Sequence, residues 1–316
     1  MFTQFLNAFD FALTVTLPSI FLLIFGYLLN RLGQIDANFC HQASRLMFNW
    51  ALPALLFFAI IDSKSAITGQ GTLLLAGAIC ALILFIGAEI VANFFIQKRD
   101  RGVFVQGIYR GNTAIIGLAF CANAYGSEGL SVGAVFTGTM TVLYNILAVI
   151  TLSRSLGNKK SILPVIINII KNPLIIGITL AGICRVLNIS LPQTVVQSGH
   201  YLSSIALPLA LICIGATFDV KAVFSRFDFS LWTSIARVIV APLLAVIIGL
   251  CFGLDKVSLG VLFLMSSAPV AAAAYVMVRA MGGNDIAMAN IVALTTVLSM
   301  LTTSLWIVIL RIFNLM

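Results

Sequence analysis

Charged side chains are scarce in this chain. They make up 9% of its 316 residues, and only 10 residues are acidic, whereas a soluble domain usually carries about 25% charged residues. The chain is instead 61% hydrophobic, with a mean hydropathy of +1.11. This composition excludes an ordinary soluble domain and predicts an integral membrane protein.

Common catalytic and metal-binding motifs are also missing. The chain has 2 histidines and 6 widely spaced cysteines, without a Cys-x-x-Cys pair. It contains no His-Glu-x-x-His, no phosphate-binding loop and no Gly-x-Ser-x-Gly, which are the patterns of common zinc, nucleotide and serine-hydrolase sites. We therefore expect no enzyme activity, no cofactor and no metal, and we expect the cysteines to be packed free thiols.

The net charge of +8 comes from lysines and arginines that are scattered between apolar runs. Nucleic-acid binding needs a basic face, so this distribution predicts no nucleic-acid partner. In membrane proteins, positive residues gather in the cytoplasmic loops. Applied to the loops of this chain, that rule places both termini on the extracytoplasmic side.

Ten apolar runs alternate with short polar loops, and each is long enough for a bilayer span of about 20 residues. They predict an all-α polytopic membrane protein with about ten transmembrane helices. The predicted spans are 11–30, 39–61, 71–96, 103–122, 129–152, 162–187, 198–218, 229–252, 257–278 and 287–311.

The two halves of the chain resemble each other. Ala-Leu-Pro at 51–53 recurs at 206–208, and Thr-Val-Leu at 141–143 recurs at 296–298, both 155 positions later. Two five-helix repeats, 1–156 and 157–316, account for this spacing. Because five is odd, the second repeat would be inverted in the membrane, as in many secondary transporters.

The fourth span carries a polar cluster, Arg110, Gly111, Asn112 and Thr113, at its centre. A central arginine costs about 2.5–3.5 kcal/mol on membrane-insertion scales. Irregular backbone at membrane depth is tolerated only where it faces protein or a wet cavity. We therefore predict a helix broken at 111–112 that forms part of a substrate site, with a packing kink as the alternative.

The repeat predicts a second break in the ninth span. Asn112 moved forward by 155 positions falls on Ser267, beside Ser266 and Pro269. We expect Asn112 to cap one half-helix and Ser267 with Pro269 to start another. Their positive ends would favour a carboxylate, although the opposing C-terminal ends partly cancel that field. Tyr275 lies close enough along the chain to line the same cavity.

Two further charges fall inside predicted spans, Glu89 in the third and Arg237 in the eighth. Buried membrane charges usually pair, so Glu89 is expected to contact Arg237 or Arg110. Two roles remain open for these residues, namely structural ion pairing and direct binding of a substrate or a proton. Glu89 is the acid best placed to carry a proton.

Three motifs resemble the auxin efflux carrier (PIN-type) family. Asn-Thr-x-x-x-Gly at 112–117 is similar to the crossover motif of its fourth helix. Lys-Asn-Pro at 171–173 resembles its Arg-Asn-Pro, and Pro269 followed by Arg279 resembles its ninth-helix proline and lysine. Gly111 replaces a proline of the plant carriers, Arg110 replaces an apolar residue, and their long central loop is absent.

The resemblance implies a ten-helix carrier that moves organic anions by an elevator-like mechanism. Spans 1, 2, 6 and 7 would form a scaffold, and spans 3–5 with 8–10 would move. We expect a bacterial inner-membrane protein that carries a small carboxylate, such as malonate or malate, or an auxin-like acid. Coupling to a proton or sodium and a homodimer are compatible with the family.

Two other functions compete with this interpretation. A sodium- or proton-coupled antiporter or symporter of related fold would need carboxylates or polar oxygens near the breaks. A non-transporting membrane sensor would bind the ligand without moving it.

Overall fold

The computed structural model describes residues 2–62, 70–157, 167, 170–218 and 229–316. Within these ranges the regular elements are all helices. Helix lies in each of the ten predicted apolar runs, although 162–166 and 168–169 of the sixth run lie outside the described residues. The predicted repeat boundary at 156 falls at the end of a helix, next to the undescribed segment 158–166.

The helices differ widely in length, from five to 39 residues. In chain order they are α1 (Phe2–Arg31), α2 (Ala37–Leu46), η1 (Met47–Ala51), α3 (Leu52–Ile61), α4 (Gly71–Phe95), α5 (Arg101–Tyr109), η3 (Thr113–Gly117), α6 (Leu118–Leu156), α8 (Pro173–Val186), α9 (Gln193–Ser204), α10 (Ala206–Ala216), α12 (Phe229–Ile235), η4 (Ala236–Val240), α13 (Ala241–Cys251), α14 (Lys256–Ser267), α15 (Ala272–Met281) and α16 (Asp285–Ile312).

Within the described ranges, seven helical segments are long and apolar enough to cross a membrane, by length and composition. Two shorter apolar helices, α8 and α14, accompany them. Large apolar side chains such as Phe94 and Phe95 are about 80% exposed, which would be costly in water but not in lipid. The chain is therefore a polytopic membrane protein.

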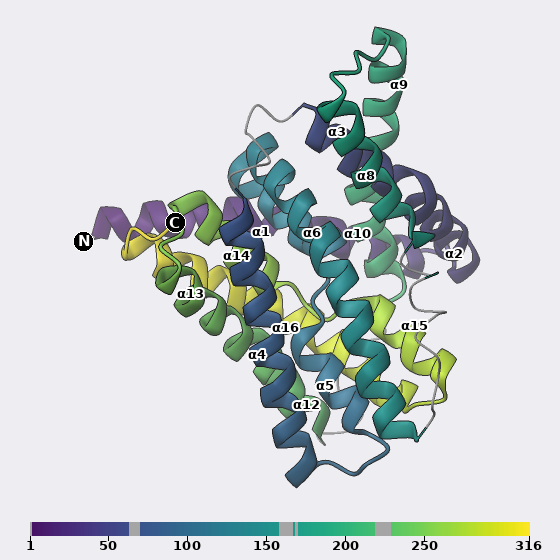
Figure 1. Ribbon diagram of the computed structural model, residues 1–316, viewed down its shortest axis with the longest axis vertical. Helices are drawn as coiled ribbons and strands as arrows, with labels where there is room; N and C mark the ends of the chain where they lie inside the picture. Colours follow the sequence, from purple (N-terminus) through teal and green to yellow (C-terminus); the bar gives the residue numbers. More distant parts are fainter. Residues whose placement is uncertain (1, 63–69, 158–166, 168–169, 219–228) are drawn as a thin grey trace.

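Helices that are distant in the sequence pack closely. Helix α1 packs against α10 and α16, and α3 packs against α8. At the first contact, a Cβ built on Gly26 of α1 would lie 2.0 Å from the carbonyl oxygen of Ile212 in α10. Both chain ends appear at the same edge of the molecule in Figure 1.

Prolines explain the π-helical turns in two of the long segments. Pro53 and Pro242 stand in the first turns of α3 and α13, directly after η1 and η4. Proline lacks an amide proton and crowds the preceding turn, so the helix widens locally there. In the second case the widened turn carries Arg237.

Helix α6 is kinked at Gly126, where φ is +58° and ψ is −137°. A positive φ with that ψ is open mainly to glycine. The kink separates a short first part, which continues η3, from a long second part. This is where the sequence predicted the loop between the fourth and fifth spans.

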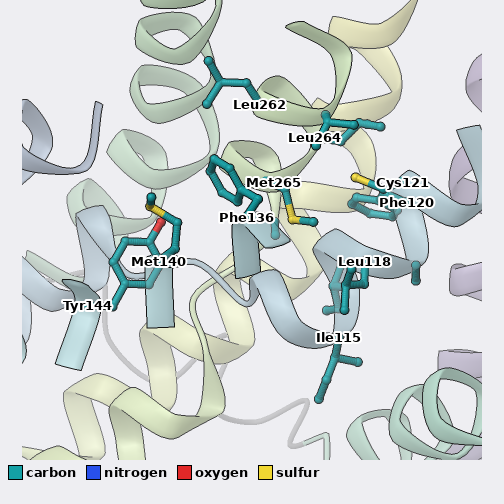
Figure 2. Packing of buried hydrophobic residues seen from close by; sticks show 14 of the residues in the cluster. Ile115, Leu118, Phe120, Cys121, Phe136, Met140, Tyr144, Leu262, Leu264 and Met265 are labelled. Atoms are coloured by element: carbon teal, nitrogen blue, oxygen red, sulfur yellow. The ribbon is translucent and has the colours of Figure 1, made fainter. Parts of the chain in front are cut away.

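Apolar side chains from α6 and α14 fill the centre of the molecule (Figure 2). Phe120 and Met265 are fully buried, and Phe136 is 2% exposed. A Cβ on Gly133 would lie 2.6 Å from the Met265 methyl carbon, so Met265 packs directly on this glycine of α6. This dense core fixes α14 against the start of α6.

Candidate functional site

Two helix breaks lie side by side at the centre of the protein. Helix α5 ends at Tyr109 and the chain becomes helical again at Thr113, while α14 ends at Ser267 and α15 begins at Ala272. Gly111 and Val270 form an antiparallel β-bridge between the breaks.

The backbones of the two breaks bond to each other. The Asn112 amide donates to the Pro269 carbonyl at 2.7 Å, and the Ala271 amide donates to the Arg110 carbonyl at 3.1 Å. Each broken helix therefore provides hydrogen-bond partners for backbone groups that the other leaves unpaired. Buried backbone groups need such partners.

A cavity of about 470 Å³ opens beside the crossing breaks. Its volume lies in the range of about 300–1,000 Å³ that is usual for small-molecule sites. The lining residues come from both breaks, from the second part of α6, from η1 and from the start of α8. They are Phe48, Arg110, Gly111, Asn112, Thr113, Ala114, Ile115, Thr141, Tyr144, Asn145, Lys171, Asn172, Pro173, Leu174, Ala271, Ala272 and Ala273.

The charged lining of this cavity is positive. Arg110 is 6% exposed, and its guanidinium donates to the Gln106 side-chain oxygen at 3.0 Å and to the Asn145 side-chain oxygen at 2.8 Å. Both partners are neutral, and the second cation, Lys171, is exposed. Among the described residues, no lining side chain is acidic. An anion would thus meet uncompensated positive charge.

Three helices start at the cavity wall. Thr113 begins the helix formed by η3 and the first part of α6, Pro173 begins α8, and Ala272 begins α15. The first amides of a helix have no partner within it, and the helix dipole makes that end positive. The starts at Thr113 and Ala272 therefore offer groups that bind anions, whereas in α8 Pro173 has no amide proton and the Leu174 amide already bonds to the Asn172 side chain.

The expected capping role of Asn112 is wrong. Asn112 occupies the N-cap position of η3, but its side chain accepts no hydrogen bond from the helix. Its φ of −80° and ψ of 66° differ from the extended conformation of a capping residue, and its carbonyl instead accepts from the Gly117 amide. The carboxamide of Asn112 lies at the cavity with no partner among the described residues.

The expectation that Ser267 and Pro269 start a half-helix is also wrong. Ser266 and Ser267 end the first half of the broken helix, Pro269 lies in the break, and the second half starts at Ala272. The Ser267 hydroxyl donates to the Phe263 carbonyl at 2.8 Å. The breaks centre on Gly111 and Val270, so the constant offset of 155 does not hold through this helix.

Pro269 and Tyr275 do not line the cavity. Pro269 is buried in the second break, where its carbonyl receives the Asn112 amide. The Tyr275 hydroxyl accepts a hydrogen bond from Arg279 at 3.1 Å, on the same helix. The first residue bonds at the crossing of the two breaks, and the second bonds within α15.

The predicted pairing of Glu89 with an intramembrane arginine is wrong. Glu89 accepts a hydrogen bond from Thr151 and lies 3.8 Å from the Arg154 guanidinium, in a separate cavity of about 320 Å³. Arg237 bonds to backbone carbonyls instead. Among the described residues, no cluster of three His, Cys, Asp or Glu side chains could hold a metal ion.

Sequence reasoning missed several lining residues. Tyr144, Asn145 and Phe48 stand in apolar runs without a local signal, because their place at the cavity depends on how distant helices pack. Lys171 and Asn172 carried a signal, since they belong to the motif that resembles the carrier family. The Asn172 side chain caps α8 by accepting from the Leu174 amide at 2.9 Å.

Comparison with known proteins identifies the family. Residues 11–307 match the model of a family described as membrane transport protein, so the chain belongs to that family, which is the auxin efflux carrier-like group that the motifs resemble. It is 25% identical to an uncharacterized transporter of Methanothermobacter thermautotrophicus, covering 94% of this chain and 98% of the relative. An uncharacterized transporter of Methanocaldococcus jannaschii is 26% identical (92% and 96% covered), and one of Escherichia coli K12 is 22% identical (81% and 83%).

Proposed function

We propose that this membrane transport protein is a secondary carrier of small organic anions with its substrate site in the cavity beside the crossing breaks. The observation that carries the proposal is a cavity of about 470 Å³ where Arg110 and three helix starts meet, and none of its described lining residues is acidic. A carboxylate there would replace its hydration shell with free amides and a guanidinium.

The apolar part of the lining bears on the substrate class. Phe48, Ile115, Tyr144 and Leu174 share the wall with the polar groups. Such a wall suits a carboxylate that is attached to an apolar body, because each buried CH₂ contributes about 0.8 kcal/mol. Within the proposed class, an auxin-like acid therefore fits better than malate.

We also propose ten spans arranged as two inverted five-helix repeats. The packing of α1 against α10 and of α3 against α8 supports this arrangement, because it joins the first span to the seventh and the second to the sixth, which a two-fold relation interchanges. The facing breaks in the fourth and ninth spans are a second such pair. An elevator-like movement of spans 3–5 and 8–10 belongs to the same proposal.

Cation coupling is the second candidate. Hard cations bind oxygen ligands such as carboxylates and carbonyls, and no carboxylate among the described residues lines the cavity at the breaks. Glu89 lies in the separate cavity with Thr151 and Arg154, where it could serve a proton but not a sodium ion beside the substrate. Proton coupling through Glu89 is therefore the form of this alternative that we retain.

The test is transport by the purified protein in liposomes. Labelled malonate, malate and indole-3-acetate would be offered with and without proton and sodium gradients. Saturable uptake of at least one acid, competed by the unlabelled acid, is expected, and uptake should increase with a proton gradient if Glu89 couples. Absence of uptake of all three acids would contradict the proposal. Binding seen as thermal stabilisation without uptake would instead identify a sensor.

A further inference from the structure

Arg237 joins the two broken helices from the side of their first halves. It is 1% exposed and stands on η4. Its Nε and Nη2 donate to the Ala268 carbonyl at 3.0 and 2.7 Å, and its Nη1 donates to the carbonyls of Ile108 and Tyr109 at 3.1 and 3.3 Å. These carbonyls lie at the ends of α14 and α5, where helices leave carbonyls without partners.

The charge of Arg237 is balanced by helix ends rather than by an acid. Among the described residues, none of the salt bridges includes Arg237. A helix C-terminus carries roughly half an elementary negative charge, so the two ends together offset about one positive charge. This explains how an arginine can be buried without a carboxylate, which would otherwise be expensive.

This contact changes the field at the cavity. Without Arg237, the negative ends of α5 and α14 would oppose the positive starts of the helices at Thr113 and Ala272. With the negative ends neutralised, the positive starts act on the cavity unopposed.

Gly111 provides the space that Arg237 needs. A Cβ built on Gly111 would lie 2.2 Å from the Arg237 Nη2, which is far inside van der Waals contact. Any side chain at 111 would therefore push the guanidinium away from the carbonyls. Gly111 and Arg237 therefore form a matched pair.

We propose that Arg237 is a positioning residue that locks the two breaks into one unit and, by neutralising the first half-helices, gives the substrate cavity its preference for anions. This deepens the proposed function, because it names what sets the charge selectivity of the same site. The field itself exists whether or not a given acid is carried.

The test uses a thiol as a probe of that field. Ala272 lines the cavity and is exposed, so Ala272→Cys places a thiol at the start of α15. A positive field stabilises the reactive thiolate. The rate of alkylation by iodoacetamide at pH 7.5 would be measured by peptide mass spectrometry in the otherwise intact chain. Cys251, which is exposed, serves as the internal reference thiol.

Three second-site variants decide the result. Arg237→Met should slow alkylation of Cys at 272 by about fivefold, the order expected for removing one charge across a partly buried path, while Cys251 reacts as before. Arg237→Lys, which keeps the charge, should restore most of the rate. Gly111→Ala keeps Arg237 but displaces it, so it should also slow the reaction.

If the Arg237 variants do not yield folded protein by size-exclusion chromatography, the alkylation rate of the Gly111→Ala variant by itself tests the proposal. An unchanged rate in folded Arg237→Met, or equal slowing by Met and Lys, would overturn the proposal. Because no substrate is involved, the outcome is independent of the liposome assay. Slowed alkylation without uptake would support the role of Arg237 and contradict the proposed carrier function. Uptake with unchanged alkylation would support the carrier function and contradict the role of Arg237.

Discussion

At the scale of single residues, Arg110 is the charged group most directly placed to bind an anion. It is buried, borders the cavity, and is held by the neutral side chains of Gln106 and Asn145. Hydrogen bonds to charged groups contribute about 1.5–3 kcal/mol. Arg110→Gln should therefore weaken anion binding by roughly 10- to 100-fold, measured as the concentration dependence of uptake or of thermal stabilisation.

A matched variant separates this effect from a general loss of charge. Arg31→Gln removes an exposed arginine at the end of α1, whose guanidinium bonds to Tyr27, and should leave binding unchanged. Loss of folding in Arg110→Gln, seen as aggregation in detergent, would instead show that Arg110 is mainly a structural partner of Asn145.

Asn112 is expected to act on the substrate and hardly on stability. Its carboxamide borders the cavity and makes no cap hydrogen bond, so Asn112→Ala removes no side-chain hydrogen bond from the folded protein. We expect uptake to fall at least about tenfold, the loss of one buried hydrogen bond to an ionised ligand, with an unchanged melting temperature.

Asn123 provides the contrast for that experiment. Its side chain donates to the Val15 carbonyl at 2.9 Å and does not line the same cavity. Asn123→Ala should lower the free energy of unfolding by about 1 kcal/mol and change uptake little. Full uptake by Asn112→Ala would remove Asn112 from the site.

Residue types predicted lining residues of the candidate cavity only where those residues were out of place in an apolar run. Arg110 and Asn112 were predictable for this reason, because polar groups at membrane depth need a function or a partner. Ser267 was misplaced because the repeat offset shifts before the second break. Tyr144 and Asn145 gave no signal at all, since only tertiary packing brings them to the cavity.

At the scale of elements, α14 depends on its N-terminal cap, Asp255. Burial raises the pKa of this carboxyl, but hydrogen bonds from the Ser258 hydroxyl and from the Ser258 and Val257 amides outweigh it and hold the pKa below its ordinary 3.8. A group whose pKa is lowered by folding stabilises the protein above its unfolded pKa. The stabilisation is lost as the pH falls below 3.8 and through the folded pKa.

Two substitutions at Asp255 test this cap. Asp255→Ala should destabilise the protein by about 1 kcal/mol at neutral pH. Asp255→Asn keeps a capping oxygen but cannot titrate, so its melting temperature should fall less than that of the parent protein between pH 5 and pH 3, the range of about two units that brackets an aspartate pKa. Equal acid sensitivity of the parent and Asp255→Asn would contradict the assigned role.

Element positions were mostly predictable, because apolar runs bounded by polar residues mark membrane helices. The kink at Gly126 and the break at 110–112 fell where the run was interrupted by glycine or polar residues. The π-helical turns were not predicted, although Pro53 and Pro242 gave the cause. The bridge between Gly111 and Val270 could not be predicted, since it pairs residues from separate segments by tertiary contact alone.

At the scale of the whole molecule, the elevator proposal divides the protein into a scaffold and a moving part. Their contact includes α1 on one side and α16 on the other, which pack together. Thr16 and Ser304 join these helices through side-chain oxygens 2.9 Å apart. The crossing breaks, Arg237 and the cavity wall from α6 all lie in the moving part, whereas η1 and the start of α8 lie in the scaffold, so the site would lie between the two parts and the breaks would move while the α1–α16 contact slides.

A disulfide across that contact should therefore arrest transport. Cysteines at both Thr16 and Ser304 would place two sulfur atoms close enough to bond, because these side chains already touch. Oxidation should reduce uptake at least about tenfold, because the disulfide would hold the moving part in one of its two states. Reduction should restore uptake. Anion binding should survive oxidation, since the cavity is not altered.

The single variants Thr16→Cys and Ser304→Cys, oxidised in the same way, should transport normally and thereby exclude an effect of the native thiols. Full uptake with the disulfide completely formed would mean that α16 does not move against α1, and the proposed division into scaffold and moving part would be wrong even if the protein carries anions.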